Sequence, residues 1–228
     1  MLNNKILKHL NNITTMSSKH SSNCLKHWIN STYLTLERIN DLQKKFRNNK
    51  PFEHLELKNF FKKEKITPLL DAVNREVFYE KQADLFHFKQ TSDLACSYNH
   101  VIKQLRDFLK SEEFTEYLTT ITRVHLFSNV LDVHGTLYQN TDYLLCHDDQ
   151  LQGRKIAYLY YLSTLKKKQG GALTFFSSKK KIPEKITRRI IPVFNTFVLF
   201  KVSPVSFHAI EEVTADTKRV AITGWFHG

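Results

Sequence analysis

Cysteine and long apolar runs are both scarce in this chain of 228 residues. The three cysteines, Cys24, Cys96 and Cys146, form no CxxC metal pair and no disulfide framework, which favours a reducing compartment. No apolar run approaches the roughly 18 residues that a membrane-spanning helix needs, and no secretory signal follows Met1. We therefore expect a monomer without a membrane partner, located in the cytoplasm, with the nucleus as an alternative in a eukaryote.

Acidic residues are also too few to balance the charge. The chain has 34 Lys and Arg against 22 Asp and Glu, a formal net charge of +12. Residues 1–50 hold part of this excess, and a second basic cluster runs from Lys166 to Arg189. Such clusters favour RNA or a ribosome as partner through counterion release. A merely solvated basic surface fits the charge equally well.

The first half of the chain has the pattern of a polar arm followed by helices. Residues 1–22 contain no acid and are typical of a mobile arm, whereas a transit peptide would be richer in Arg. We place a basic arm and helix at 1–45 and one domain at 46–228. Thr67-Pro68 resembles a helix N-cap followed by Pro in the first turn. Apolar spacing predicts helices from 25 to before Pro51, over 67–77, 98–110 and 111–121, and a loop over 79–93.

The second half of the chain has the pattern of short strands. One earlier strand and turn is expected at 55–61. Beyond residue 122, short β-branched and aromatic runs alternate with turn residues, as in a sandwich or jelly roll. The expected strands are 123–131, 133–139, 143–147, 155–163, 172–176, 189–193, 196–202, 205–210 and 218–226. Helices followed by strands predict an α+β fold, in which the helices support one face of a sheet.

One short motif, His147-x-Asp149, points to metal chemistry. Residues i and i+2 of a strand share a face, so both side chains are expected to reach one metal ion. His208 lies in a later apolar run, and Arg219 follows it by eleven residues. Two His and one carboxylate form the facial triad of non-haem Fe(II) oxygenases. A nearby Arg offers a planar fork for a carboxylate, so the order of these residues is typical of 2-oxoglutarate oxygenases.

Longer runs around these residues resemble a known family. Residues 147–157, 202–208 and 224–228 are similar to signatures of the ribosomal prolyl hydroxylases, and weaker similarity begins near Phe52. Those enzymes use Fe(II) and 2-oxoglutarate to hydroxylate a proline of a small-subunit ribosomal protein. Their eukaryotic members carry a second, degenerate domain after Gly-Trp-Phe-His-Gly. We expect this chain to be either a single-domain relative or a fragment.

The resemblance implies a fold, a set of cofactors and a set of site residues. The fold is a double-stranded β-helix, or jelly roll, with supporting N-terminal helices. The cofactors are Fe(II), 2-oxoglutarate and O2, with ascorbate as reductant. The substrate is a prolyl residue of a ribosomal protein, with rRNA as a further contact. The implied metal ligands are His147, Asp149 and His208, and the implied 2-oxoglutarate contacts are Arg219, Tyr138, Tyr161 and Thr223.

Several alternatives remain open at this point. A plain core role is a serious rival for Tyr138 and Tyr161, since a buried Tyr usually finds a partner. Gly170-Gly171 predicts either a close backbone approach beside the site or an ordinary turn. Asp148 is expected to support the site or to form a turn. Rival functions are a nucleic-acid demethylase with the same cofactors and a non-catalytic, basic ribosome- or RNA-binding module.

Overall fold

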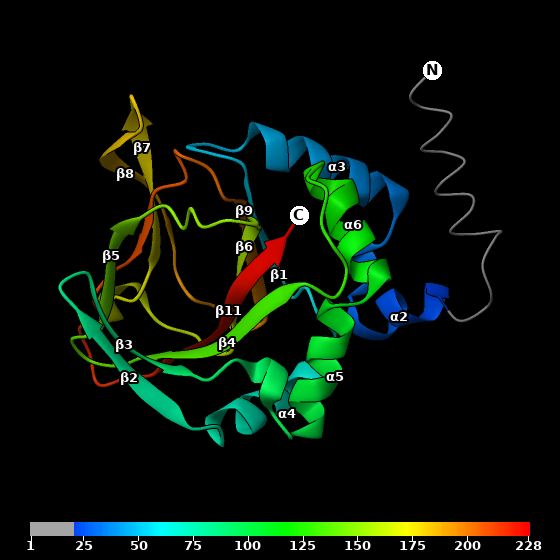
Figure 1. Ribbon diagram of the computed structural model, residues 1–228, viewed down its shortest axis with the longest axis horizontal. Helices are drawn as coiled ribbons and strands as arrows, with labels where there is room; N and C mark the ends of the chain where they lie inside the picture. Colours follow the sequence, from blue (N-terminus) through cyan, green and yellow to red (C-terminus); the bar gives the residue numbers. More distant parts are fainter. Residues whose placement is uncertain (1–20) are drawn as a thin grey trace.

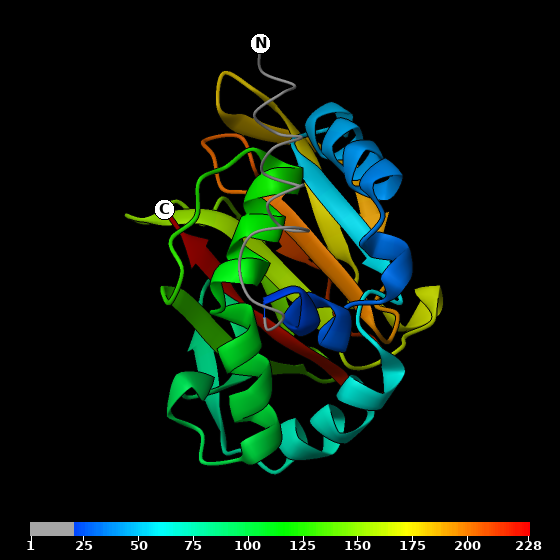
Figure 2. The ribbon, with the colours of Figure 1, turned by 90° about the vertical axis from the view of Figure 1, so that its right-hand side faces the viewer.

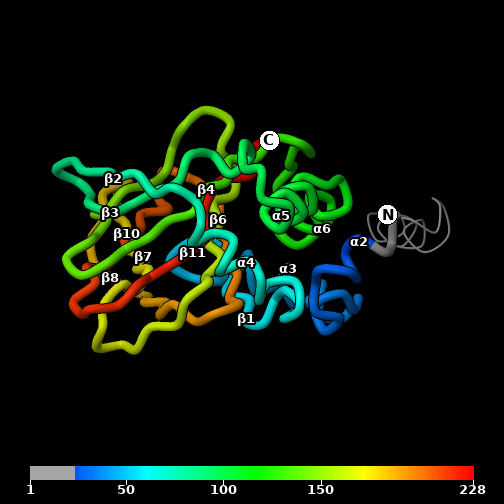
Figure 3. The backbone as a smooth tube through the Cα atoms, turned by 90° about the horizontal axis from the view of Figure 1, so that it is seen from below, coloured from blue at the N-terminus to red at the C-terminus, as the bar shows by residue number. Residues whose placement is uncertain are grey.

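The computed structural model describes residues 21–228, so most of the expected arm over residues 1–22 lies outside the described residues. Helices gather on one side of a curled sheet, as the view in Figure 3 shows. The helices are α2 (Ser21–Trp28), α3 (Leu36–Asn48), α4 (Lys63–Asn74), α5 (His100–Leu109) and α6 (Glu112–Thr122). This arrangement confirms the expected α+β fold with supporting helices.

The sheet is antiparallel throughout and curls into a barrel-like shape (Figure 1). Its strand order is β1-β9-β6-β11-β4-β3-β5-β10-β7-β8, and β2 pairs with β3 off this path. The two ends of the order approach each other, because Arg188 of β8 bonds Glu56 of β1 at 2.8 Å. The strands are β1 (His54–Lys58), β2 (Phe78–Ala83), β3 (Phe86–Thr91), β4 (Leu131–Tyr138), β5 (Tyr143–His147), β6 (Arg154–Tyr161), β7 (Leu173–Lys179), β8 (Ile182–Ile190), β9 (Thr196–Lys201), β10 (His208–Ile210) and β11 (Arg219–His227).

The central strand β11 separates two cores. Its Val220, Ile222 and Phe226 belong to the larger core, which lies between the sheet and the helices. Its Ala221 and Trp225 belong to a smaller core inside the curl of the sheet. This alternation is the period-2 pattern of a strand covered on both faces. Figure 2 shows the helices lying over one face of the sheet. The opposite face is therefore the one that can hold a site.

The long helix expected before Pro51 is in fact two helices. Asn30 caps a 3-10 turn by accepting a hydrogen bond from the Thr32 amide, and Thr35 caps α3 by accepting one from the Arg38 amide. Short polar side chains satisfy free amides at helix starts, so these residues interrupt the helix even where the apolar spacing continues. The apolar residues of α3 nevertheless pack into the larger core.

The N-cap expected at Thr67 is wrong. Helix α4 already begins at Lys63, and Pro68 lies inside it. The Thr67 hydroxyl donates a hydrogen bond to the Lys63 carbonyl within the helix. Ile66 and Leu69 are fully buried in the larger core, so packing holds the turn before the proline in the helix. Tertiary burial here outweighs the loss of one backbone hydrogen bond.

The sequence pattern missed strands that are exposed. Residues 79–93 form most of the β2–β3 hairpin rather than a loop, and β8 begins seven residues before its expected start. Both β2 and β8 are largely exposed, so their sequences lack the apolar alternation of a half-buried strand. The expected strand over 123–131 is also wrong, since only Leu131 of that run belongs to a strand.

Candidate metal and cosubstrate site

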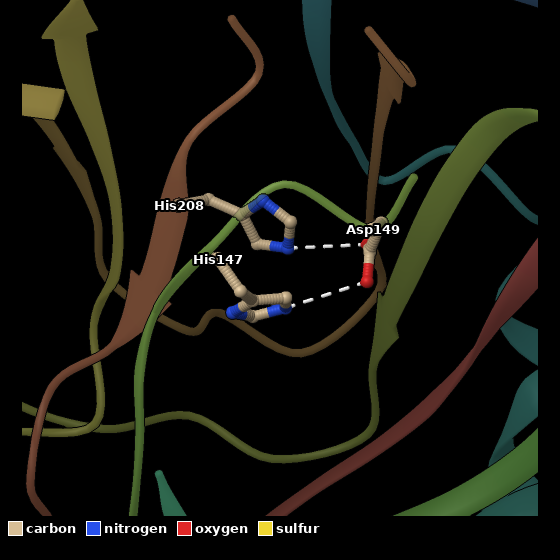
Figure 4. A group of neighbouring side chains, drawn as sticks. All are labelled: His147, Asp149 and His208. Carbon is tan, nitrogen blue, oxygen red and sulfur yellow. Dashed lines mark ion pairs between the residues drawn. The ribbon is translucent and has the colours of Figure 1, made fainter. Parts of the chain in front are cut away.

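His147, Asp149 and His208 come together inside the curl of the sheet (Figure 4). His147 ends β5 and His208 begins β10, and the two residues face each other across this strand pair. One ligand atom from each of the three residues lies within 4.8 Å of the others. The Asp149 carboxylate is 3.4 Å from His147 Nε2 and 3.2 Å from His208 Nε2. The three predicted residues therefore share one site.

We expected His147 and Asp149 to share one face of a strand. This prediction is wrong, because Asp149 does not lie on a strand. Strand β5 stops at His147, and Asp149 has a left-handed backbone with φ of 63°. Asp is among the few residues that adopt this conformation at low cost. Asp148 forms a turn between them, since its carboxylate accepts hydrogen bonds from the Gln150 amide and side chain. A tight loop, not a shared strand face, turns the carboxylate toward the histidines.

Backbone carbonyls orient both imidazole rings. His147 Nδ1 lies 2.8 Å from the Leu145 carbonyl, and His208 Nδ1 lies 2.9 Å from the Ser206 carbonyl. A carbonyl only accepts, so each Nδ1 carries a proton, and when the ring is neutral its Nε2 keeps a lone pair that can bind a metal. Metal-binding histidines are commonly held in this way.

Charges in the site keep the carboxylate ionised. Burial raises the pKa of Asp149, but the charge of His208 and hydrogen bonds from both histidines outweigh it and hold that pKa well below its usual range. Burial lowers the pKa of His147, and the neighbouring Asp149 more than offsets this, so the pKa is raised. An ionised oxygen beside two imidazole nitrogens is the ligand set that divalent iron accepts. The residues present thus fit the metal that the motif implies.

A pocket of about 120 Å³ opens beside the three residues. Its walls also include Tyr138 and Thr223, two of the predicted cosubstrate contacts, and Phe88, which stacks on Tyr138 at 4.9 Å. Tyr161 does not line this pocket and lies behind it, against Arg219. Three of the four expected cosubstrate contacts, Tyr138, Thr223 and Arg219, therefore line the pocket, and Tyr161 lies next to Arg219.

Arg219 is the most unusual residue of this pocket, because its side chain is fully buried and carries a charge. Its Nε donates a hydrogen bond to the Gly171 carbonyl at 2.8 Å. Nη1 and Nη2 are buried and have no partner among the described residues. The guanidinium lies between the rings of Tyr138 and Tyr161, at 4.9 and 5.1 Å. A buried cation without an anion is strongly unfavourable, so the arrangement fits a carboxylate ligand.

Gly171 makes a close backbone approach, which is one of the two alternatives left open for the Gly170-Gly171 pair. Its φ of 70° is left-handed, and an added Cβ would lie 2.9 Å from Leu165 and 3.2 Å from Arg219 Cδ. Only glycine fits such a position without strain. The Gly171 carbonyl thereby reaches Arg219 Nε, and the other two guanidinium nitrogens are left without a partner among the described residues.

The tyrosine hydroxyls beside Arg219 stay protonated and are available as donors. Burial is the largest cause that raises the pKa of both Tyr138 and Tyr161, and the Arg219 charge offsets it only in part. The Tyr161 hydroxyl is buried without a partner among the described residues. Because Tyr161 does not line the pocket, this hydroxyl lies beside the Arg219 guanidinium rather than on the pocket wall.

Sequence reasoning missed a second group of residues at the other end of the pocket. The Arg154 guanidinium lies 3.4 Å from the ring centroid of Trp225, and Asp132 is 3.8 Å from Arg154 Nε. Trp225 lines the pocket, and its Nε1 is buried without a partner in the part of the chain described. The alternation of β11 could have found it, since Trp225 lies six residues after Arg219 and shares its face.

Comparisons with known proteins agree with this geometry. A model of the 2OG-Fe(II) oxygenase superfamily matches residues 133–227. Prolyl 3-hydroxylase OGFOD1 of Mus musculus is 36% identical over 185 residues, which cover 78% of this chain and 33% of that protein. The Xenopus laevis protein of the same name is 42% identical over 154 residues, covering 66% and 30%. The chain thus spans about a third of the length of these curated relatives.

Solved structures show the same fold. A Pseudomonas putida prolyl-4-hydroxylase has a TM-score of 0.65 at 15% identity, over 82% of this chain and 98% of that one. A Trichoplax adhaerens prolyl hydroxylase, solved with a hypoxia-inducible-factor peptide, also has a TM-score of 0.65, at 19% identity and over 84% and 91%. These matches confirm the expected double-stranded β-helix. The fold, the matched model and the relatives together show that the chain belongs to the 2OG-Fe(II) oxygenase superfamily.

Proposed function

We propose that this chain hydroxylates a prolyl residue of a protein, using Fe(II), 2-oxoglutarate and O2. The observation that carries the proposal is the buried Arg219, which lines the same pocket as His147, Asp149 and His208 and has two unpartnered nitrogens. A fully buried fork without an anion is unfavourable unless a carboxylate ligand completes it. The relatives named prolyl 3-hydroxylase supply the choice of proline.

His147, Asp149 and His208 would hold the iron. Both Nε2 atoms and one Asp149 oxygen converge, and the protonated Nδ1 atoms fix the rings in place. The bound iron, with 2-oxoglutarate and O2, supplies the oxidising power to hydroxylate a carbon–hydrogen bond, and ascorbate would keep the metal reduced. The protein contributes ligand geometry and a pocket that limits the access of water.

Arg219 would bind the distal carboxylate of 2-oxoglutarate through Nη1 and Nη2. The Gly171 carbonyl occupies Nε, so the guanidinium is already oriented before the ligand arrives. Tyr138, Tyr161 and Thr223 would add hydroxyl contacts in the same part of the structure. Hydrogen-bond donors that are oriented before the ligand binds lose little conformational entropy on binding. This raises the affinity for a dicarboxylate.

Trp225 and Arg154 would receive the substrate at the other end of the pocket. A prolyl ring is apolar, and the indole face offers apolar area beside the metal site. The unpartnered Nε1–H of Trp225 can donate to a carbonyl of the substrate backbone. Arg154, stacked on the indole, holds the ring in place. Specificity would come from this shape and from backbone contacts, because proline has no side-chain charge.

We further propose that the target is a small-subunit ribosomal protein, met in the cytoplasm next to rRNA. The run His147–Ala157 and the run Val202–His208, which resemble the ribosomal prolyl hydroxylases, support this choice. A protein with a net charge of +12 would be repelled by a free basic substrate, so recognition beside rRNA fits its charge better. In the part of the chain that the structure describes, no helix is long and apolar enough to span a membrane.

The test is direct hydroxylation of ribosomal proteins. The protein is incubated with Fe(II), ascorbate, 2-oxoglutarate and small-subunit ribosomal proteins, and the products are mapped by mass spectrometry. We expect one added oxygen on a proline and stoichiometric succinate, both absent in a variant with Asp149→Ala. Oxygen found only on a nucleobase methyl group would reject the proposal, as would the absence of any modified residue.

A further inference from the structure

The tip of the β7–β8 hairpin has an unusual backbone for its sequence. Lys179 pairs with Ile182 across the hairpin, which leaves Lys180 and Lys181 as a two-residue loop. Their φ angles are 51° and 62°. Two central residues with positive φ define a type I′ turn, for which Asn-Gly is the preferred sequence. Here both positions are lysine.

Lysine is costly in this turn. A side chain in the left-handed region destabilises the fold, because its Cβ crowds the following carbonyl. Asn or Gly would form the same turn with little strain. Lysine at both positions gives the tip a positive charge that the preferred Asn-Gly turn would lack.

The charge at this tip is free. Among the described residues, no carboxylate lies within 4 Å of the ammonium groups of Lys179, Lys180 or Lys181. By contrast, Arg188 and Arg189 further along β8 pair with Glu56 and Glu211. An edge strand often carries Lys to prevent pairing with another sheet, but the two turn residues lie outside the ladder and have no edge to protect.

The tip also lies at the end of the barrel where substrate would enter. Strand β7 starts beside Gly171 and Arg219, passes His208 at Phe175, and continues four residues to Lys179. At about 3.3 Å per residue, the tip stands more than 10 Å beyond the iron ligands, on the side away from Arg219. The hairpin projects from the body of the protein in Figure 1. Along β11, Trp225 lies farther than Arg219 toward this same end of the barrel.

We infer that the Lys179–Lys181 tip binds the phosphate backbone of RNA beside the substrate proline. The choice of RNA over other polyanions rests on the proposed function, and the surface itself rests on the turn and its free charge. A narrow, protruding hairpin with three ammonium groups can follow a phosphate backbone at close range, and such contacts are insensitive to base sequence. The hairpin would thus hold a ribosomal target in register with the metal site.

The test uses a variant that should fold better than the native protein. Lys180→Asn with Lys181→Gly restores the favoured turn and removes two charges. The matched control, Lys167→Gln with Lys168→Gln, removes two exposed charges at the opposite end of β7. Binding of a fluorescein-labelled RNA stem-loop is followed by fluorescence anisotropy over a series of KCl concentrations.

Counterion release sets the expected size of the effect. Two lost phosphate contacts should lower the slope of log K against log salt by about 1.4–1.8. The same contacts are worth about 25- to 60-fold in RNA affinity at roughly 0.1 M salt. We expect this loss in the turn variant and a much smaller one in the control. Native RNA affinity in the turn variant would overturn the inference, and so would an equal loss in both.

Two further measurements distinguish RNA from an acidic protein as the partner, and RNA binding from prolyl hydroxylation. Poly-glutamate is titrated in place of RNA, and tighter binding of it through Lys180 and Lys181 would assign the surface to an acidic protein instead. Hydroxylation of a short prolyl peptide is measured in parallel and should not change in the turn variant. RNA binding that behaves as expected, without any hydroxylated proline, would leave this surface in place and remove the proposed function.

Discussion

Two positively charged regions of this molecule differ in how their charge is held. Arg219 is fully buried, oriented by the Gly171 carbonyl and flanked by two tyrosine rings. The lysines at 179–181 are exposed at the end of a projecting hairpin. The buried cation can select one small dianion by geometry, whereas exposed lysines attract polyanions with little regard to shape. Net charge alone identifies neither region, because their surroundings decide what each can bind.

The largest effect is expected when the Fe(II) site beside Arg219 loses a ligand and no longer binds the metal. Asp149→Ala removes the one anionic member of the triad and should abolish Fe(II)-dependent succinate formation while the fold persists. Asp148→Ala, one residue away, disturbs only a turn and should retain iron binding. Anaerobic Fe(II) titration checks both variants. Normal turnover in Asp149→Ala would show that the metal is held elsewhere.

Arg219→Met tests whether the buried guanidinium binds 2-oxoglutarate rather than stabilising the fold. The variant should bind 2-oxoglutarate more weakly by about 2–3 kcal/mol, or about 30- to 150-fold, as measured by calorimetry. Without ligand, its free energy of unfolding should rise by about 1 kcal/mol or more, because an unpaired buried cation is removed.

Arg188→Met is the matched control for this pair of measurements. Its guanidinium is half-exposed and already paired with Glu56, so 2-oxoglutarate affinity should not change. A ligand-free Arg219→Met that is markedly less stable than the native protein would mean that the arginine serves packing alone, and the contrast between the two regions would then fail.

A smaller effect is expected from Gly171→Ala, which acts on Arg219 through the backbone. The added Cβ would crowd Leu165 and Arg219 Cδ at a position of positive φ. We expect a loss of about 1–3 kcal/mol in the free energy of unfolding. Affinity for 2-oxoglutarate should also fall, while Fe(II) affinity measured without it should not. A variant that loses stability but keeps full 2-oxoglutarate affinity would show that Arg219 needs no such positioning.

The smallest effect belongs to the exposed region. Lys180→Asn with Lys181→Gly should raise the free energy of unfolding by about 1–2 kcal/mol, because the left-handed turn no longer carries strained side chains. For a chain of this size the melting temperature should rise by about 2–8 °C in a thermal melt. An unchanged or lower melting temperature would mean that the two lysines are not strained in this turn.

Sequence patterns predicted the site better than the path of the chain around it. His147, Asp149, His208 and Arg219 were all predicted, and the structure places them in one pocket. The strand-face argument for Asp149 failed, because a left-handed residue cannot be recognised from spacing alone.

Exposed strands, and contacts between residues far apart in the sequence, were harder to predict. The β2–β3 hairpin carries no apolar alternation, so periodicity gave no signal for it. Trp225 and Arg154 lie 71 residues apart in sequence and meet only because β6 and β11 are paired. Such contacts depend on sheet register, which local propensity does not determine.

The sheet order also has a consequence for how the chain reaches its native state. Strand β11 is the last strand described, yet it lies between β4 and β6 near the middle of the sheet. Strand β1 pairs with β9, so His54 and Phe200 meet across most of the sequence. Contacts of such long range make folding slow, because a large loop must close before pairing stabilises it. During synthesis the helices can form early, but the barrel must wait for β11, so the three iron ligands cannot be held together until the chain through β11 has been made.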